Sequence, residues 1–466
     1  MWNFKAFSGN TAIIDEGGKN YSYSWLDGEC GKLAENVKSG RCLVFNLCSN
    51  EPGSLIGYAA FIDHSIVPVM LDAHMDRGLL ASLIDTYQPD YLWLPSGMAE
   101  EFPSCAERYS SVGYSLLKTP FTKVFPLYEE LGLLLTTSGS TGSPKFVRQS
   151  YANIRANTES IVRYLELDST ERPITTLPMS YTYGLSIVNT HLYVGASIIL
   201  TQKALMQKEF WQLLKNHGAT SFGGVPYTYE MLEKLRFFRM DLPTLRTMTQ
   251  AGGKLSPELH KKFAEYALDK GKHFVVMYGQ AEATARMSYL PHEKSLEKYG
   301  SMGIAIPGGE FSLIDVNGKE IMAPDVVGEL VYKGKNVTLG YAESGKDLIK
   351  GDERGGVLLT GDMARRDEDG YYYIVGRKKR FLKLYGSRVN LVEVEELLKK
   401  KNYEAACVGE DDHMRIYTTS EDTAGLHSYI ASIMGINRAA FEVFHIAAIP
   451  RNEAGKVLYS NLEVQK

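Results

Sequence analysis

Short apolar runs alternate with helical patterns between residues 24 and 279, and this alternation limits the fold more than any other feature. CLVFNL (42–47) and SIVPVML (65–71) have the composition of buried strands, whereas SWLDGECGKLAENV (24–37) has the apolar spacing of a helix. The same rhythm recurs in ASIILT (196–201), KEFWQLLKNHG (208–218), ATSFGGV (219–225) and KHFVVMYG (272–279). Strands that alternate with helices predict parallel sheets covered by helices.

The pattern changes from about residue 300. GEFSLIDVNGKEI, GELVYKGKNVTLGY and GYYYIVGR are short, punctuated by glycine and rich in β-branched or aromatic residues. They predict antiparallel strands with tight turns, one of them at Asn317-Gly318. NLVEVEELLKKK (390–401) then predicts a helix whose lysines lie at its carboxyl end, where they suit the helix dipole. We therefore expect a small α+β domain at the end of the chain, and a length of 466 residues agrees with more than one domain.

The balance of charge and the cysteines exclude several classes of protein. The chain has 51 Lys and Arg against 55 Asp and Glu, a net charge of −4, so we expect no nucleic-acid partner. The five cysteines are scattered without CxxC spacing, which predicts free thiols and neither a disulfide framework nor a zinc site. The start of the chain does not resemble a signal peptide, and no apolar run reaches the ~20 residues of a membrane helix, so we expect a cytoplasmic protein without membrane insertion. The sequence predicts no oligomeric state.

The stretch TTSGSTGSPKFVRQS (136–150) combines glycines, small hydroxyl side chains and one lysine directly after an apolar run. Glycines let backbone N–H groups approach an anion, hydroxyls add donors, and a lysine adds a compact positive charge, so the composition suits phosphate. The alternative is a flexible turn without a ligand. The pattern G-x-x-x-x-G-K-[ST] does not fit because its second glycine is missing. Pro144 and the following KFVRQ predict that a strand follows, so the loop is interpreted as a strand–loop–strand clamp.

This loop resembles the phosphate loop of the adenylate-forming (AMP-binding) enzymes, the family of acyl- and aryl-CoA synthetases. Four more blocks resemble the family's motifs in the same order: MYGQAEAT (277–284), LLTGDMARRDEDGYYYIVGR (358–377), KLYGSRVNLVEVE (383–395) and IPRNEAGKVLYSNL (449–462). Together with the strand pattern, the resemblance implies an α/β fold with two domains. Residues 1–376 would form a large N-terminal domain of mixed, mostly parallel sheets with helices plus a distorted antiparallel barrel-like part. Residues 377–466 would form a small, mobile C-terminal α+β domain.

The resemblance implies an ATP- and Mg²⁺-dependent ligase. Such an enzyme joins a carboxylic acid to the α-phosphate of ATP, releases pyrophosphate, and passes the acyl group to the phosphopantetheine thiol of CoA or of an acyl carrier protein. Because two anions must meet, catalysis would rest on charge neutralisation and alignment. Two alternatives stay open: an amino-acid-activating ligase that loads a carrier protein, and a non-catalytic nucleotide-binding homologue.

The resemblance also assigns catalytic and phosphate-binding roles. Lys456 would stabilise charge between the carboxylate and the α-phosphate. Thr141 and Glu282 would contact Mg²⁺, which needs few carboxylates beside phosphate and water oxygens. Lys379 would stand at the hinge of the mobile domain, and the run 377–380 is interpreted as this hinge plus a solvated basic face. The phosphate-binding residues would be Thr137, Ser138, Gly139, Ser140, Thr141, Gly142 and Lys145.

Two further groups would bind the nucleoside and the acid. Asp362 would accept hydrogen bonds from the ribose hydroxyls together with Arg377, and Tyr278 would stack on adenine. The nucleotide-binding residues would be Gly252, Gly253, Tyr278, Gly279, Gln280, Asp362 and Arg377. The acyl pocket would be lined by Tyr181, Tyr183, Gly223, Gly224, Val225 and Gln250, with Gln280 beside them.

Three departures from the family pattern bear on the substrate. Tyr181 stands where the family often has His, and Ala281 replaces the Thr of Tyr-Gly-x-Thr-Glu, which predicts slower adenylation through loss of a hydrogen bond worth ~0.5–1.5 kcal/mol. No acidic residue occurs from Leu177 to Thr190, where amino-acid-activating members carry an Asp. Since a buried ammonium without a partner is costly, we expect a short or medium acyl or aryl acid without an α-amino group.

Overall fold

The computed structural model describes residues 1–122, 125–136, 145–384, 387–410, 412–434, 436–451 and 457–463. Contacts between Cα atoms divide the chain into two compact units. The first unit holds the chain up to Phe311 together with Tyr332–Leu358, and the second holds Ser312–Val331 and the chain from Leu359 onward. The domain boundary predicted between residues 376 and 377 falls inside the second unit and stays a prediction.

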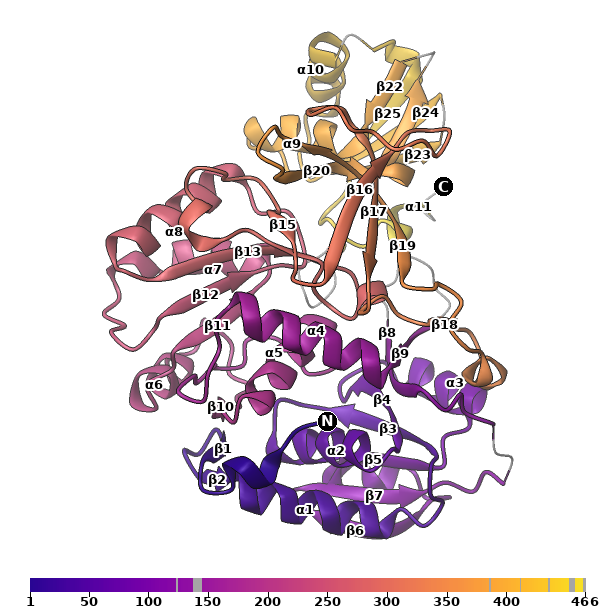
Figure 1. The fold of residues 1–466 in the computed structure, drawn as a ribbon. Coiled ribbons are helices and arrows are strands. Elements are labelled where there is room, and N and C mark those ends of the chain that lie inside the picture. The colour runs from indigo at the N-terminus through magenta and orange to yellow at the C-terminus, as the bar shows by residue number, and fades with distance from the viewer. Residues whose placement is uncertain are drawn as a thin grey trace. The chain divides into compact units, whose positions relative to one another are not determined.

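An eight-stranded mixed sheet is the largest element of the first unit (Figure 1). Its four central strands are parallel, in the order β8-β4-β3-β5, and antiparallel strands extend both edges. The strands are β3 (Leu43–Cys48), β4 (Val67–Asp72), β5 (Tyr91–Pro95), β6 (Ala106–Ser111), β7 (Tyr114–Lys118), β8 (Leu131–Thr136), β9 (Phe146–Ser150) and β18 (Gly340–Ala342). The prediction of strands at 42–47 and 65–71 is confirmed, because both runs form central strands that are buried along their length.

A five-stranded mixed sheet forms the second layer of strands in this unit. Its strands β11, β12 and β13 are parallel, and β14 and β15 continue the sheet in antiparallel pairing. The strands are β11 (Ser221–Gly224), β12 (Thr247–Gln250), β13 (His273–Tyr278), β14 (Ser288–Tyr289) and β15 (Ile304–Ala305). A small third sheet has the order β10-β1-β2, with bounds Ile198–Ile199, Thr11–Ile14 and Asn20–Ser22.

Several helices of the first unit begin with a side-chain cap. Ser150 and Asn153 form a reciprocal capping box at the start of α4, and Ser256 caps α8, whose first residue is Pro257. The helices are α1 (Tyr23–Asn36), α2 (Pro52–Asp63), α3 (Arg77–Tyr87), α4 (Tyr151–Tyr164), α5 (Thr182–Tyr193), α6 (Lys208–Asn216), α7 (Pro226–Lys234) and α8 (Pro257–Asp269). The helices predicted at 24–37 and 208–218 are therefore confirmed.

The antiparallel region predicted after residue 300 is an open sheet. Its four strands have the order β16-β17-β19-β20, with bounds Gly309–Ile314, Gly328–Gly334, Val357–Arg366 and Tyr372–Arg377. The barrel-like part that we expected is thus not a closed barrel among the described strands, because β16 and β20 stand at opposite edges of this order. The predicted turn is present: Asp315 Oδ1 accepts hydrogen bonds from the backbone of Asn317 and Lys319, and Gly318 has a φ of 79°.

The end of the chain forms the α+β structure that the sequence predicts. A hairpin of β21 and β22 precedes a three-stranded sheet in the order β23-β24-β25. Leu398 of α9, Ile416 of β24 and Ile430 of α10 meet in one apolar cluster. The elements are β21 (Phe381–Leu384), β22 (Ser387–Asn390), α9 (Leu391–Lys400), β23 (Ala405–Glu410), β24 (His413–Thr418), α10 (Thr423–Met434), β25 (Phe441–His445) and α11 (Ser460–Glu463).

Candidate functional site

Residues of two predicted groups, the nucleotide-binding residues and the acyl pocket, lie at one edge of the five-stranded sheet, where its parallel strands end. β11, β12 and β13 lie side by side and are parallel (Figure 1). In their register Gly224 is opposite Gln250, and Gln250 is opposite Val276. Their carboxyl ends therefore bring together Gly223, Gly224, Val225, Gln250, Gly252, Gly253, Tyr278, Gly279 and Gln280. In α/β sheets the carboxyl ends of parallel strands are the usual place for a ligand.

Two of these glycines are required by close packing. A Cβ atom on Gly279 would lie 1.6 Å from the carbonyl oxygen of Ala285. Gly252 has a φ of +83°, and its Cβ would lie 2.6 Å from the hydroxyl of Tyr181. The contact at Gly252 places an aromatic residue of the predicted acyl pocket directly beside the predicted nucleotide-binding backbone.

The acyl-pocket residues of α5 pack onto the same edge. Tyr183 exchanges a 2.8 Å hydrogen bond with Thr249 of β12, and its hydroxyl would lie 3.0 Å from a Cβ on Gly223. Tyr183 and Val225 share an apolar cluster, against which Tyr181 packs. Burial raises the pKa of Tyr181 to about 12, although Arg286 opposes this shift, so the phenol stays neutral at neutral pH. The predicted pocket residues are thus brought together around α5.

Glu282, the predicted magnesium ligand, has an aromatic partner that the sequence did not indicate. Tyr341 donates a hydrogen bond to Glu282 Oε1 over 2.6 Å. Lys145 Nζ lies 4.0 Å and the Arg354 guanidinium 4.8 Å from the centroid of the Tyr341 ring. Burial, then the charge of Glu282, raise the pKa of Tyr341 to about 12, so its hydroxyl keeps its proton and remains a donor. Glu282 Oε2 accepts no hydrogen bond from the described residues, which leaves this oxygen available to a cation.

The turn that carries Glu282 is held by the segment before β18. Asn336 donates hydrogen bonds to the carbonyls of Ala283 and Arg286 over 2.9 and 3.0 Å. Thr284 has a φ of 64° and donates to the carbonyl of Asn336 over 2.7 Å. These contacts fix a backbone conformation that is strained for a β-branched residue, and such strain is typical of functional sites.

Arg286 belongs to this site, although the sequence gave no reason to select it beyond its place four residues after Glu282. Its side chain is 2% exposed and lies over the ring of Tyr183, with 4.3 Å between the guanidinium carbon and the ring centroid. Its Nη2 donates to Ser186 Oγ over 3.0 Å. A buried cation therefore lies against the predicted acyl pocket.

The predicted ribose-binding pair lies in the second unit. Asp362 on β19 and Arg377 on β20 are opposite each other in the antiparallel register, and Arg377 Nε lies 3.0 Å from Asp362 Oδ1. The Asp362 side chain is 4% exposed. The two residues are adjacent as expected, and their ribose-binding role stays a prediction.

The basic run at 377–380 agrees in part with the expected solvated face, because the side chains of Arg377 and Lys378 are 66% and 59% exposed. By contrast, the side chain of Arg380 is only 13% exposed, and its Nη2 lies 2.6 Å from Glu395 Oε1. Lys378 pairs with Glu329 over 2.7 Å. Both charges are thus neutralised within this unit, and the guanidinium of Arg380 stabilises the packing of α9. The hinge role of Lys379 stays a prediction.

Some predicted residues lie outside the described residues: Thr137, Ser138, Gly139, Ser140, Thr141, Gly142 and Lys456. Antiparallel pairing of β8 and β9 on either side of the loop nevertheless confirms the strand–loop–strand connection. Among the described His, Cys, Asp and Glu residues no group of three could hold a metal ion. The described helices also include none that is long and apolar enough to cross a membrane.

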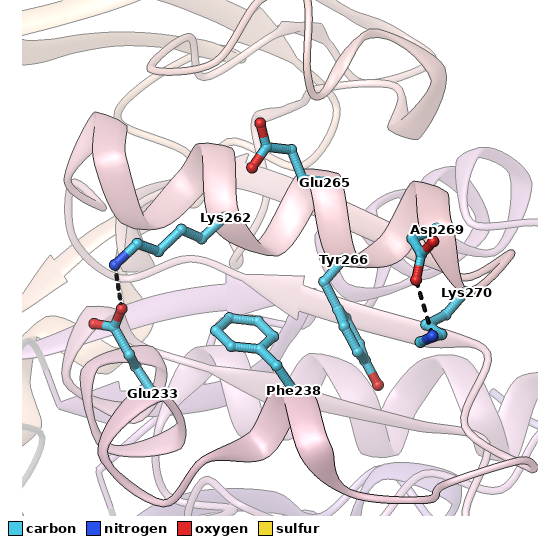
Figure 2. A pocket seen from close by; sticks show the side chains of 7 residues that line it. All are labelled: Glu233, Phe238, Lys262, Glu265, Tyr266, Asp269 and Lys270. Atoms are coloured by element: carbon cyan, nitrogen blue, oxygen red, sulfur yellow. Dashed lines mark hydrogen bonds and ion pairs between the residues drawn. The ribbon is translucent and has the colours of Figure 1, made fainter.

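A separate shallow groove of about 470 Å³ lies between α7, the turn at Phe238 and α8 (Figure 2). Lys262 pairs with Glu233, and Lys270 pairs with Asp269 over 2.8 Å, while Phe238 and Tyr266 lie between these pairs. Its lysines are neutralised by acids of the groove itself, and it contains none of the predicted site residues.

Comparisons with known proteins find CoA ligases among the relatives of this chain. Peroxisomal OPC-8:0-CoA ligase 1 of Arabidopsis thaliana is 27% identical over 352 residues, which cover 72% of this chain and 64% of that protein. Sulfoacetate–CoA ligase of Cupriavidus necator is 30% identical over 341 residues, which cover 70% and 65%. Long-chain-fatty-acid–CoA ligase of Bacillus subtilis is 27% identical over 377 residues, which cover 78% and 65%. The chain thus matches less than two thirds of the length of each of these relatives.

Solved structures share the fold. The O-succinylbenzoate coenzyme A synthetase from Bacillus subtilis in complex with AMP has a TM-score of 0.79 at 21% identity, with 99% of this chain and 98% of that chain covered. ATP-bound MatB from Rhodopseudomonas palustris has a TM-score of 0.79 at 21% identity, with 98% and 97% covered. The profile of the AMP-binding enzyme family matches residues 2–342. The chain therefore belongs to the AMP-binding enzyme family.

Proposed function

We propose that this protein is an ATP-dependent acid–thiol ligase that forms an acyl-adenylate and transfers the acyl group to the phosphopantetheine thiol of CoA. The observation that carries the proposal is the shared edge of β11, β12 and β13, where the predicted nucleotide-binding and acyl-binding residues meet beside Glu282. The relatives reported above are named CoA ligases, which favours CoA over a carrier protein as the acceptor. An acyl carrier protein, which presents the same thiol arm, is the alternative acceptor.

ATP and Mg²⁺ fit the described residues. One carboxylate oxygen of Glu282 has no partner among the described residues, and Tyr341 fixes the other. One carboxylate beside phosphate oxygens and water suits Mg²⁺. When bound, the cation would neutralise phosphate charge between Glu282 and Thr141. Lys145 would add a positive charge at the end of the phosphate loop, and Tyr278 with the backbone at Gly252 and Gly253 would enclose adenine.

The chemistry needs two anions to react, so positive charge must reach the bond that forms. The carboxylate oxygen of the acid attacks the α-phosphorus of ATP, and the bond from that phosphorus to the pyrophosphate oxygen breaks. Lys456 would stabilise the charge on the oxygens at the α-phosphorus. In the second step the thiol sulfur attacks the acyl carbon, AMP leaves, and the thiol proton goes to solvent or base.

The sequence narrows the class of the acid substrate without identifying the acid. No acidic side chain occurs from Leu177 to Thr190, so no carboxylate of this segment can pair with a substrate ammonium. The relatives' names cover acids as different as sulfoacetate and long-chain fatty acids. The proposal is therefore a carboxylic acid without an α-amino group.

Acid-dependent exchange of labelled pyrophosphate into ATP tests the proposal. The purified chain is assayed with fatty, aryl, hydroxy, dicarboxylic and amino acids, and CoA or loaded carrier protein is then added to the productive acid. We expect exchange with at least one acid without an amino group. Exchange with amino acids alone would establish the carrier-loading alternative, and no exchange with any acid would favour a non-catalytic nucleotide binder.

Lys456→Ala separates the two steps. We expect exchange to fall about 10²- to 10³-fold, while thiol transfer from a supplied acyl-adenylate stays largely intact. Lys270→Ala, which removes an exposed lysine paired with Asp269, is the matched control and should change neither step. Equal loss of both steps in Lys456→Ala would contradict the assigned role.

A further inference from the structure

Arg286 is a buried cation without an acidic partner. Its Nη1 contacts the hydroxyl of Tyr164 over 3.3 Å and the sulfur of Met277, and its Nη2 donates to Ser186 Oγ. Among the described residues no carboxylate forms an ion pair with it, and Nε is buried without a hydrogen-bond partner. All of these partners are neutral groups.

This arrangement leaves the charge of Arg286 uncompensated. Removing an ion from water costs several kcal/mol, and only a partner charge with good hydrogen bonds offsets most of that cost. The cation–π contact with the ring of Tyr183 offsets only part of that cost. Burial keeps the nearby phenols protonated, with the pKa of Tyr164 raised to about 12, so none supplies a negative charge.

The location of Arg286 indicates which group could supply the missing negative charge. The ring that it contacts belongs to Tyr183, which packs with Val225 and Met277 in the cluster that receives Tyr181. Ser186, its hydroxyl partner, lies one turn after Tyr183 on α5. The guanidinium therefore belongs to the wall of the predicted acyl pocket, where a bound acid could supply the negative charge that no side chain of the described residues supplies.

We propose that Arg286 binds a second oxyanion of the acid substrate, a carboxylate or sulfonate at the end opposite the carboxyl group that is activated. The inference rests on the proposed function and adds the substrate class. Nε and Nη2 share one edge of the planar guanidinium, and Ser186 takes only one of the two Nη2 hydrogens. That edge suits an oxyanion through two parallel hydrogen bonds. Because the guanidinium is covered, a neighbouring ring such as Tyr183 must rotate when the second anion binds.

The test compares each dianionic acid with its neutral-ended partner. Pyrophosphate exchange is measured for a series of dicarboxylic acids, their monomethyl esters and ω-sulfo carboxylic acids, with the native chain and with Arg286→Met and Arg286→Lys. We expect the native chain to prefer the dianions. Arg286→Met should lower kcat/KM for the best dianion about 10²- to 10³-fold and change the ester less than about 3-fold. Arg286→Lys keeps the charge but loses the pair of parallel hydrogen bonds, so its kcat/KM for the best dianion should lie between the values of the native chain and of Arg286→Met.

A binding measurement separates recognition from folding. The best dianion should raise the melting temperature of the native chain and of Arg77→Met, an exposed-arginine control, but not that of Arg286→Met. If Arg286→Met does not fold, Arg286→Lys alone carries both measurements. Neutral-ended acids that react as well as dianions in the native chain would overturn this inference while the proposed function stands. No exchange with any acid would instead overturn the proposed function.

Discussion

Two buried arginines of the first unit differ in what surrounds them. Arg148 on β9 is 0% exposed, and its guanidinium donates to the carbonyls of Tyr341 over 3.0 Å and Gly351 over 3.2 Å and pairs with the Glu353 carboxylate. Arg286 is 2% exposed, and among the described residues it meets hydroxyls, a thioether and an aromatic face but no carboxylate. The first site is complete within the protein, whereas the second lacks an anion.

This difference in partners distinguishes Arg148, a structural arginine, from Arg286, which we assign to ligand binding. Arg148 joins β9 to the segment around β18, and its donors satisfy carbonyls that would otherwise be buried without partners. Arg380 in the second unit follows the same pattern, with Glu395 and the carbonyl of Cys407 as its partners. Arg286 departs from both, and this departure is the reason to assign it to the substrate.

The largest effect on stability is expected at Arg148, whose partners all belong to the protein. Arg148→Met should lower the free energy of unfolding by about 3–5 kcal/mol, because Glu353 and several backbone carbonyls lose their donor. Urea unfolding followed by circular dichroism measures this change. A loss below about 1 kcal/mol would show that burial and hydrogen bonding do not distinguish the two arginines, and the comparison would fail.

Tyr341→Phe extends the comparison to Glu282, an acid that, unlike Glu353, pairs with a hydroxyl. Removal of this hydroxyl frees Glu282 Oε1 and loosens the carboxylate, so we expect about a 10-fold higher Mg²⁺ concentration for half-maximal pyrophosphate exchange. Tyr193→Phe is the matched control, since its hydroxyl also donates to a carboxylate, Glu159, over 3.3 Å. An equal shift in both variants would mean that Tyr341 has no specific role in orienting Glu282.

Arg286→Met should change stability much less than Arg148→Met. The neutral partners keep other contacts, because Tyr164 also meets Met277 over 3.1 Å and Ser186 donates to the carbonyl of Tyr183 over 2.7 Å. Since an apolar side chain often replaces a buried ion without loss, the free energy of unfolding should stay within about 1 kcal/mol of the native value, with either sign. Urea unfolding without substrate tests this. A loss as large as that of Arg148→Met would make Arg286 a structural residue.

The comparison also shows which parts of the molecule could be predicted from the sequence. Period and composition predicted β3, β4, β11, β13 and the helices α1, α6 and α9, because each is a local property of the chain. The family blocks placed Gly252, Tyr278 and Glu282, which the fold brings to one edge. Tyr341 and Arg286 were missed because their roles depend on contacts with residues 59 and 122 positions away, which no local pattern specifies. That the predicted antiparallel part is open among the described strands could not be foreseen, because strand composition does not reveal whether the edges of a sheet meet.

The smallest expected effect concerns the pH dependence of stability through His191, whose pKa is lowered in part by the charge of Arg286. Burial lowers the pKa of His191 to about 4, the hydrogen bond to the Ile187 carbonyl opposes this, and the charge of Arg286 adds to the lowering. The folded chain therefore holds His191 neutral while the unfolded chain binds a proton near pH 6.5, so stability is lost as pH falls from about 6.5 toward 4.

In Arg286→Met the pKa of His191 should rise toward its ordinary value, because one nearby cation is gone. The loss of stability on acidification should then be smaller than in the native chain by about 0.5 kcal/mol, measured by urea unfolding at several pH values. His260, whose pKa is also lowered to about 4 by burial but without a contribution from Arg286, is the internal control. The difference should vanish in a His191→Gln background and persist in a His260→Gln background. Persistence in both would mean that a titrating group other than His191 causes the difference. No difference at all between the native chain and Arg286→Met would mean that the charge of Arg286 is already neutralised before any substrate binds, which would contradict its assignment as an uncompensated cation.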